Sequence, residues 1–258
     1  MTNQVNQTNQ NKFNLNFRVG LNSLLPDNTM ALPGLMDYVQ EVSYFHTHSI
    51  DGLFEYYDRM NLVWVLTHWH VEVARQPRVG EHINISTWPV QFKGYFGERG
   101  FAATDSAGET ILRANSNWLM LDRNVLKPAR ASEELIAKYG PPYPFPIEKN
   151  FALPKPDGFA TLSTHKYTPT RRDIDTNNHV NNVRYLEWVC CHIPDDIYHN
   201  YRAQSLKVAY KKETLLGDDL EIKLMRRDCG HDGIEILAII EKNGQTATEV
   251  YTKWQSIQ

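Results

Sequence analysis

The stretch "VEVARQPRVGEHINI" (residues 71–85) has a counterpart later in the chain, "VAYKKETLLGDDLEI" (residues 208–222). Both segments alternate apolar residues around a turn made of Gly and an acidic residue, which is typical of a long strand, a turn and a returning strand. The two segments align at a constant offset, so the chain is expected to contain two similar halves. The aligned pairs are Val71–Val208, Arg75–Lys212, Gly80–Gly217, Glu81–Asp218 and Ile85–Ile222.

A proline-rich segment separates the halves. Residues 140–158 read "GPPYPFPIEKNFALPKPDG", and proline favours extended, non-helical chain, so this segment is predicted to be a semi-rigid linker. The N-terminal domain is then 13–139 and the C-terminal domain 159–258, and each carries a tryptophan (Trp118, Trp254) in an alternating run near its end. The Asn/Gln-rich residues 1–12 are expected to form a disordered tail.

Each half also offers one helix candidate, at residues 51–66 and 181–191, because apolar residues recur there near helical spacing. Several strand-like runs follow each helix. A long helix wrapped by an antiparallel sheet, present twice, predicts an α+β fold of the tandem (double) hotdog type.

The overall composition limits the function classes. The formal net charge is −3, from 27 basic and 30 acidic residues, which argues against a nucleic-acid partner. Three cysteines without a CxxC motif indicate a reducing compartment, and no apolar run approaches the length of a membrane span, so we expect a cytoplasmic protein. His68 and His70 alternate as in a strand and lack further ligands nearby, so neither a metal site nor a cofactor is predicted.

Polar groups gather just before the second helix candidate, in "RRDIDTNNHVNNVRYLEWV" (171–189). Asp175, Asn177 and His179 occupy alternate positions there, and Glu213 follows within a strand-like run. A simpler interpretation is a loop whose side chains cap the helix. However, the first half has no D-x-N-x-H and carries neutral Gln76 at the position of Glu213, so only one half is expected to carry a polar site.

These residues resemble a known family. "RRDIDTNNHVNNVRYLEWV" with "YKKETLLGD" is similar to the acyl-acyl-carrier-protein thioesterases of plants and bacteria, as are "NLVWVLTHWHVEVARQPRVGEHINISTWP" and "GETILRANSNWLMLD". The resemblance runs from about Phe45 to Trp254 and implies a tandem hotdog whose N-terminal domain holds the acyl chain. It also implies hydrolysis of fatty acyl-carrier-protein thioesters to free fatty acid and carrier protein, which ends chain elongation in fatty acid biosynthesis. The catalytic residues implied are Asp175, Asn177, His179 and Glu213.

One position departs from the plant members, which tend to have Cys directly after the glutamate, whereas this chain has Thr214. A thiol at that position is therefore not required for the expected reaction. The main mechanistic rival would use Cys190 or Cys191, but both lie within the helix candidate and are expected to be packing residues.

The expected mechanism needs an oxyanion site and a base. Backbone N–H groups near His179 and Val180, at a helix N-terminus, are the expected oxyanion donors, with the Asn177 amide or the imidazole assisting. Asp175, Glu213 and His179 all stay open as the base. Acidic carrier protein would dock on basic residues flanking the site, although a solvated charged face explains them equally well. These residues are Arg171, Arg172, Arg184, Lys207, Lys211 and Lys212.

Two other function classes remain. An acyl-CoA thioesterase or a 3-hydroxyacyl dehydratase would use the same fold, but a dehydratase would not need the Asn177 amide and would yield an enoyl product. A non-catalytic acyl-binding protein should have lost one of the four polar residues, which are all present. The sequence does not give the acyl chain length, and it leaves a homodimer as an open option.

Overall fold

The computed structural model describes residues 12–230 and 232–257 and divides the chain into two compact units. Unit 1 comprises residues 1–67 and 71–149, and unit 2 comprises 68–70 and 150–258. The tail predicted for residues 1–12 lies, except for Lys12, outside the described residues. The predicted domain boundaries 13–139, 140–158 and 159–258 stay a prediction.

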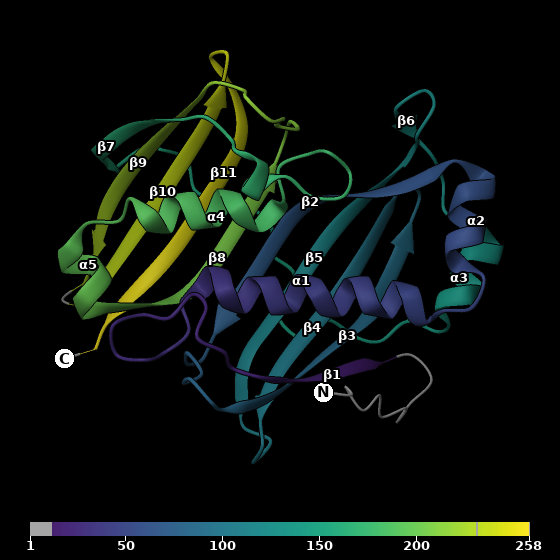
Figure 1. Ribbon diagram of the computed structural model, residues 1–258, viewed down its shortest axis with the longest axis horizontal. Coiled ribbons are helices and arrows are strands. Elements are labelled where there is room, and N and C mark those ends of the chain that lie inside the picture. Colours follow the sequence, from purple (N-terminus) through teal and green to yellow (C-terminus); the bar gives the residue numbers. More distant parts are fainter. Residues whose placement is uncertain (1–11, 231, 258) are drawn as a thin grey trace. The chain divides into compact units, whose positions relative to one another are not determined.

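Unit 1 places a long helix, α1, across the face of an antiparallel sheet with the strand order β1-β3-β4-β5-β2, as Figure 1 shows. Two short helices and a two-residue strand complete the unit. Its elements are β1 (Phe13–Arg18), α1 (Leu32–Ser49), α2 (Leu53–Met60), β2 (Leu62–Val73), β3 (His82–Lys93), β4 (Phe96–Asp105), β5 (Thr110–Asp122), β6 (Lys127–Pro128) and α3 (Glu133–Tyr139).

Unit 2 has the same plan, with helix α4 across the strand order β7-β9-β10-β11-β8 (Figure 1). The helix predicted at 181–191 is confirmed as α4. Its elements are β7 (Ala160–Tyr167), the 3-10 helix η1 (Arg171–Asp173), α4 (Asn182–Cys191), α5 (Asp195–Asn200), β8 (Tyr201–Tyr210), β9 (Leu220–Cys229), β10 (Gly233–Lys242) and β11 (Gln245–Ser256).

The two strand orders are identical when β1, β3, β4, β5 and β2 are matched with β7, β9, β10, β11 and β8. The match extends to side-chain detail. Trp118 Nε1 donates to Ser116 Oγ at 2.7 Å, and Trp254 Nε1 donates to Thr252 Oγ1 at 2.7 Å. The repeat predicted from the sequence is therefore a repeat of topology and of local packing.

The strand pairing expected from the two aligned segments was wrong. The segment 71–85 does connect two strands, β2 and β3, but these strands do not pair with each other. β3 pairs with β1 and β4, and β4 and β5 lie between β3 and β2 in the sheet. The tight hairpin instead joins β3 to β4, where Lys93 pairs with Phe96 across a two-residue turn. Gly94 has φ +63° there, a conformation that a two-residue hairpin needs and that glycine adopts without a Cβ penalty.

The helix predicted at 51–66 is confirmed only over Leu53–Met60, because the rest of the segment enters a strand. The chain forms α2, reverses at Asn61 in the left-handed conformation (φ 52°), and enters β2 at Leu62. The β-branched and aromatic residues of "LVWVL" favour this strand. Among the described residues, no helix is both long and apolar enough to cross a membrane.

The central helix of unit 1 is α1, a segment for which the sequence analysis made no prediction. It begins without a side-chain cap at Ala31, with a proline in its first turn. Its buried face follows helical spacing and packs on β1 and β3, so burial stabilises it. The buried residues are Leu32, Pro33, Gly34, Leu35, Met36, Val39, Val42, Ser43 and His46.

The proline-rich segment contains no helix or strand between residues 140 and 158. Its first part is bonded to unit 1, because Trp88 Nε1 donates to the Pro144 carbonyl at 3.0 Å and Tyr143 N–H donates to the Pro89 carbonyl at 3.0 Å. Its last part belongs to unit 2, where Leu153 packs on Met225, Leu237 and Tyr251. The first part of the segment is therefore attached to unit 1 and its last part to unit 2.

Candidate active site

The loop between η1 and α4 is closed by the Asp175 carboxylate. Asp175 Oδ1 accepts the N–H groups of Asn177 at 2.8 Å and His179 at 3.3 Å, and Asp175 N–H donates to the His179 carbonyl at 2.8 Å. Asn178 adopts the left-handed conformation (φ 63°) that completes the turn. This arrangement is an Asx-type turn, in which a short acidic side chain replaces a backbone partner.

Helix α4 begins after this loop, so the capping residue differs from those considered in the sequence analysis. Asn181 is the N-cap, and its side chain accepts the Val183 N–H at 2.9 Å. Asp175 and Asn177 therefore shape the loop, and the helix start is left to Asn181.

The Glu213 carboxylate contacts the His179 imidazole. Glu213 follows the end of β8, and its Oε2 lies 3.3 Å from His179 Nε2. The side chains of His179 and Glu213 are 38% and 56% exposed, so water reaches both. Asn177 is exposed, and its Nδ2 lies 3.5 Å from Asp175 Oδ2. The structure thus brings all four predicted residues together within unit 2.

The expected backbone oxyanion donors were wrong. His179 N–H is directed at Asp175 Oδ1, and Val180 N–H donates to the Thr214 carbonyl at 2.9 Å. Both groups hold the loop in place, because a buried backbone donor is costly to leave unpaired. The Asn177 amide and the His179 imidazole keep polar atoms accessible for a developing oxyanion.

Asp173 is a buried carboxylate that anchors the loop, and the sequence analysis did not identify it. Asp173 accepts hydrogen bonds from Thr170 N–H (2.7 Å), Tyr167 OH (3.0 Å) and Trp188 Nε1 (3.3 Å). Burial raises the pKa of Asp173, but these hydrogen bonds outweigh it and leave the pKa below the ordinary value. The Asp173 carbonyl also accepts the Asn181 N–H at 2.8 Å, so the same residue fixes the start of α4.

A second group missed by the sequence analysis lies behind Glu213. Tyr185, Thr214 and Thr248 are all buried. Burial raises the pKa of the Tyr185 hydroxyl to about 12, although the neighbouring Thr214 and Thr248 hydroxyls lower it in part. The three hydroxyl groups form one buried cluster at Thr214, the residue that follows Glu213.

Unit 1 contains a loop with the same backbone hydrogen bonds as the loop between η1 and α4, but with different side chains at the candidate catalytic positions. The bridge between Leu24 and Met30 matches the bridge between Ile174 and Val180. Likewise Leu25 N–H donates to the Thr29 carbonyl at 2.8 Å, as Asp175 N–H does to His179. The following residues of unit 1 occupy the positions of Asp175, Asn177, His179 and Glu213 in that order: Leu25, Asp27, Thr29 and Gln76.

The buried hydroxyl groups beside Glu213 also have no counterpart in unit 1. The positions of Tyr185, Thr214 and Thr248 are taken in unit 1 by Leu35, Pro77 and Leu112, all of them buried. The polar constellation is therefore confined to unit 2, as the contrast between Glu213 and Gln76 predicted.

The structure does not support the alternative mechanism in which Cys190 or Cys191 is the nucleophile. Burial raises the pKa of the Cys190 thiol well above its ordinary value, and burial also raises that of Cys191. Cys190 lies about 12 Å along the axis from the start of α4, given a rise of about 1.5 Å per residue. Neither thiol is placed as an activated nucleophile.

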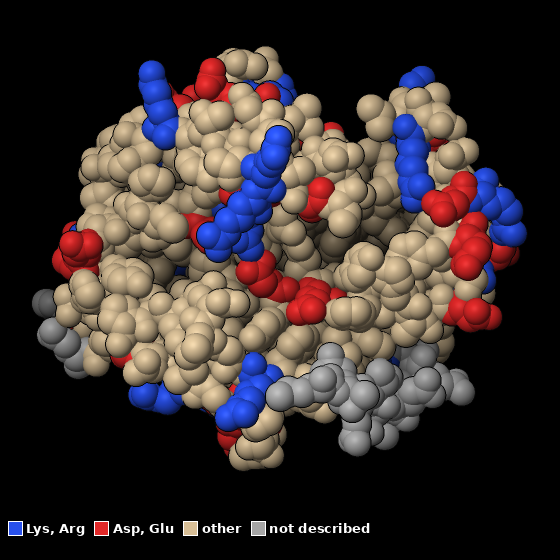
Figure 2. Space-filling model, in the orientation of Figure 1, with Lys and Arg blue, Asp and Glu red and all other residues tan. Residues whose placement is uncertain are grey.

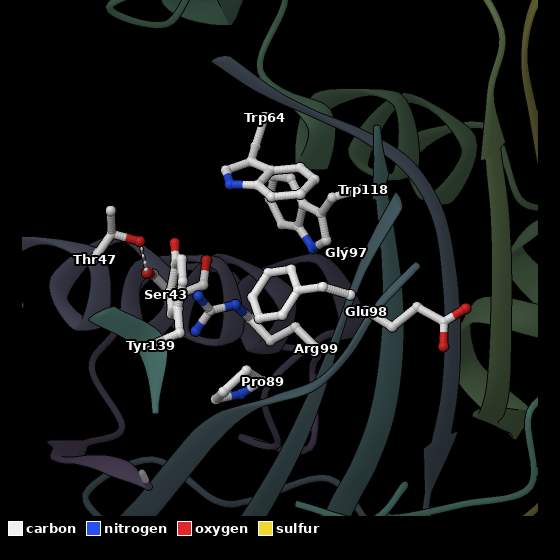
Figure 3. Close-up of a pocket in the computed structure, with 10 residues that line it drawn as sticks. Ser43, Thr47, Trp64, Pro89, Gly97, Glu98, Arg99, Trp118 and Tyr139 are labelled. Carbon is white, nitrogen blue, oxygen red and sulfur yellow. Dashed lines mark hydrogen bonds between the residues drawn. The ribbon is translucent and has the colours of Figure 1, made fainter. Parts of the chain in front are cut away.

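A pocket opens in unit 1, the unit expected to hold an acyl chain (Figure 3). Trp64, on β2, lines this pocket. Trp118 from β5 and Phe92 from β3 line it as well. Trp69 is instead a buried core residue.

Comparisons with known proteins agree on one family. Residues 10–139 match the acyl-ACP thioesterase N-terminal domain, and residues 159–256 match the acyl-ACP thioesterase C-terminal domain. Oleoyl-acyl carrier protein thioesterase 2, chloroplastic, of Arabidopsis thaliana is 31% identical over 76% of this chain and 57% of its own length. The corresponding oleoyl enzyme of Coriandrum sativum is 27% identical over 94% of this chain and 68% of its own. This chain thus spans little more than half of the Arabidopsis relative.

Solved structures of proteins named as ACP thioesterases share the fold of this chain. An acyl-ACP thioesterase from Bacteroides thetaiotaomicron superimposes with a TM-score of 0.79 at 24% identity, covering 95% of this chain and 98% of that one. The 12:0-ACP thioesterase from Umbellularia californica gives 0.82 at 22% identity, covering 95% and 94%. The predicted α+β double hotdog is confirmed.

Proposed function

This chain belongs to the acyl-ACP thioesterase family, and we propose that it hydrolyses fatty acyl-ACP thioesters to free fatty acid and carrier protein. The observation that carries the proposal is the contact between His179 and Glu213 beside the loop that Asp175 closes. The relatives named above as oleoyl-acyl carrier protein thioesterases support the substrate class.

In the mechanism that we propose, His179 is the base and Glu213 orients it. When Nε2–H donates to the Glu213 carboxylate, Nδ1 is left unprotonated and takes a proton from the attacking water. The water oxygen bonds to the thioester carbon, and the C–S bond then breaks as the sulfur of the carrier leaves with a proton. The Asn177 amide donates to the carbonyl oxygen as negative charge develops on it.

Asp175 has a different part in this proposal. Its Oδ1 atom already accepts two backbone N–H groups, so the carboxylate holds Asn177 and His179 in register. It acts through the loop, whereas His179 and Asn177 act on the substrate.

Acyl carrier protein is the proposed partner. Figure 2 shows Lys and Arg side chains gathered over the part of unit 2 that Figure 1 labels α4. Arg171 and Arg172 are exposed in η1, whereas Lys211 pairs with Glu249 at 2.7 Å. We therefore assign the first contact with the acidic carrier to Arg171 and Arg172.

Hydrolysis assays with matched substrates test both parts of the proposal. Dodecanoyl-ACP and dodecanoyl-CoA are compared across salt concentrations, with free fatty acid as the readout. We expect faster turnover of the ACP substrate and a steeper loss with salt. Reversing the charges of Arg171 and Arg172 to Glu should lower kcat/KM for the ACP substrate alone. Lys223→Glu, on an exposed position of β9, is the matched control.

Absence of fatty acid release from either substrate would overturn the activity. Release without a preference for the carrier substrate would favour the acyl-CoA alternative. The cytoplasmic location expected from the cysteine content is also part of the proposal, and fractionation of the source cells tests it.

A further inference from the structure

The pocket of unit 1 contains a buried guanidinium group. Arg99, on β4, is 8% exposed and lines this pocket. Figure 3 shows the Arg99 side chain near Tyr139 and Ser43, while the neighbouring Glu98 carboxylate points away from them. Adjacent residues of a strand face opposite sides, which explains this divergence.

No carboxylate among the described residues neutralises this charge. Arg99 Nη1 lies 2.7 Å from His46 Nδ1 and 3.3 Å from Thr87 Oγ1, and the guanidinium also interacts with the Tyr139 hydroxyl. Glu98 is engaged elsewhere, because it pairs with Lys149 and accepts a hydrogen bond from Gln91.

The groups around Arg99 are neutral. Burial, followed by the positive charge of Arg99, lowers the pKa of His46 to about 2, so its ring is uncharged at neutral pH. The three neutral acceptors leave N–H donors unused, since a guanidinium carries five of them. Arginine does not release its proton in proteins, so the buried charge persists and favours an added acceptor.

The rest of the pocket wall is partly aromatic, alongside Thr47, Gly97 and Glu98. Trp64, Phe92 and Trp118 line it together with Pro89. The Trp64 ring approaches the backbone closely, because a Cβ added to Gly97 would lie 2.9 Å from Trp64 Cη2. The indole N–H of Trp64 is bound to the Tyr57 hydroxyl at 2.9 Å, so the ring presents carbon to the pocket. Apolar ring surfaces favour contact with an aliphatic chain, but a plain methyl end does not satisfy Arg99.

We propose that this pocket takes acyl chains bearing an oxygen function, a hydroxyl, oxo or carboxylate group on the carbon chain, which Arg99 binds. The inference rests on the proposed function, because it names the class of acyl chain that the enzyme selects. The oxygen accepts N–H donors of the guanidinium, and the carbon chain packs on the tryptophans.

Ligand binding tests the selection separately from hydrolysis. The full chain is titrated with methyl dodecanoate and with its hydroxy and oxo derivatives, the oxygen being moved along the chain, and with the monomethyl ester of dodecanedioic acid. The ester head group is neutral in every compound, so only the chain differs. Quenching of tryptophan fluorescence reports binding, since Trp64 and Trp118 line the pocket.

We expect at least one oxygenated ester to bind tighter than methyl dodecanoate by roughly 10- to 100-fold, the range of a hydrogen bond to a charged group. Arg99→Met, which keeps the volume of the side chain, should remove that preference and bind methyl dodecanoate more tightly. Arg113→Met, at an exposed arginine of β5, should leave the preference intact. Circular dichroism checks that each variant folds.

Two results would overturn the inference. One is a wild-type chain that binds no oxygenated ester more tightly than the parent, which is informative even if Arg99→Met does not fold. The other is a preference that survives in a folded Arg99→Met variant. Glu213→Gln should keep the binding preference, so loss of hydrolysis alone leaves the inference standing.

Discussion

His179 Nε2 lies 3.3 Å from Glu213 Oε2, and a backbone hydrogen bond lies beside this pair. Val180 N–H donates to the Thr214 carbonyl at 2.9 Å, so the residues that follow His179 and Glu213 are joined to each other. The imidazole and the carboxylate therefore meet because their backbones are paired. If this pair acts as the base, the carboxylate is necessary for the chemistry.

Replacing Glu213 by Gln tests that requirement. Gln is the residue that unit 1 carries at this position, as Gln76, so the fold should tolerate it. We expect kcat to fall by about 10²–10⁴-fold, the range of general acid–base catalysis, with little change in Tm. Glu221→Gln, at an exposed position of β9, serves as the control. Near-normal kcat in Glu213→Gln would remove the carboxylate from the mechanism.

Two substitutions at Asp175 separate its positioning role from a role as base. Asn offers an oxygen at the place of Asp175 Oδ1, where the N–H groups of Asn177 and His179 are bound, whereas Ala offers none. If the carboxylate orders the loop, Asp175→Asn should keep kcat within about tenfold of wild type, and Asp175→Ala should lose about 10²-fold or more. Equal inactivity of two folded variants would instead identify Asp175 as the base.

The sequence predicted the four candidate residues, but it predicted neither the buried groups around them nor the whole fold. D-x-N-x-H was recognisable because its residues are close in the sequence, and α4 because its apolar face is regular. Glu213 was recognisable by its contrast with Gln76 and by the family resemblance. Helix α1 escaped prediction for physical reasons. It starts at an uncapped Ala31, contains Pro33 and Gly34, and buries the polar residues Ser43 and His46 on the face where apolar residues are expected.

The second loop escaped prediction because the repeat is not uniform. The strands of the two units align at one offset, as Val71 with Val208, but the loops align at another, as Asn28 with Asn178. Unit 1 has a longer central helix between its loop and its strands, 18 residues in α1 against 10 in α4, which shifts the register. Only the paired bridges and matching backbone conformations reveal the correspondence.

Thiol chemistry gives a test with a defined pH dependence. In a Cys190→Ala/Cys229→Ser background, Cys191 is the only thiol left, and burial raises its pKa. Since the thiolate is the reactive form, alkylation by iodoacetamide should be slow at neutral pH and accelerate only above the ordinary titration range of cysteine. Hydrolysis should continue at the wild-type rate after complete alkylation. Loss of activity in step with modification would revive the cysteine mechanism.

The Asp173 anchor predicts an acid-sensitive contribution to stability. The folded state lowers the pKa of Asp173, so its stabilising effect is complete above the unfolded value near 3.9 and is lost as pH falls through the lower folded value. Asp173→Asn should reduce the free energy of unfolding by about 1–3 kcal/mol at neutral pH, because hydrogen bonds to a charged acceptor are weakened. The difference from wild type should shrink below about pH 4. Urea unfolding at neutral and acidic pH measures it, and Asp195→Asn, in the first turn of α5, provides the control. A difference that stayed constant across pH would show that the Asp173 charge contributes nothing to the anchor.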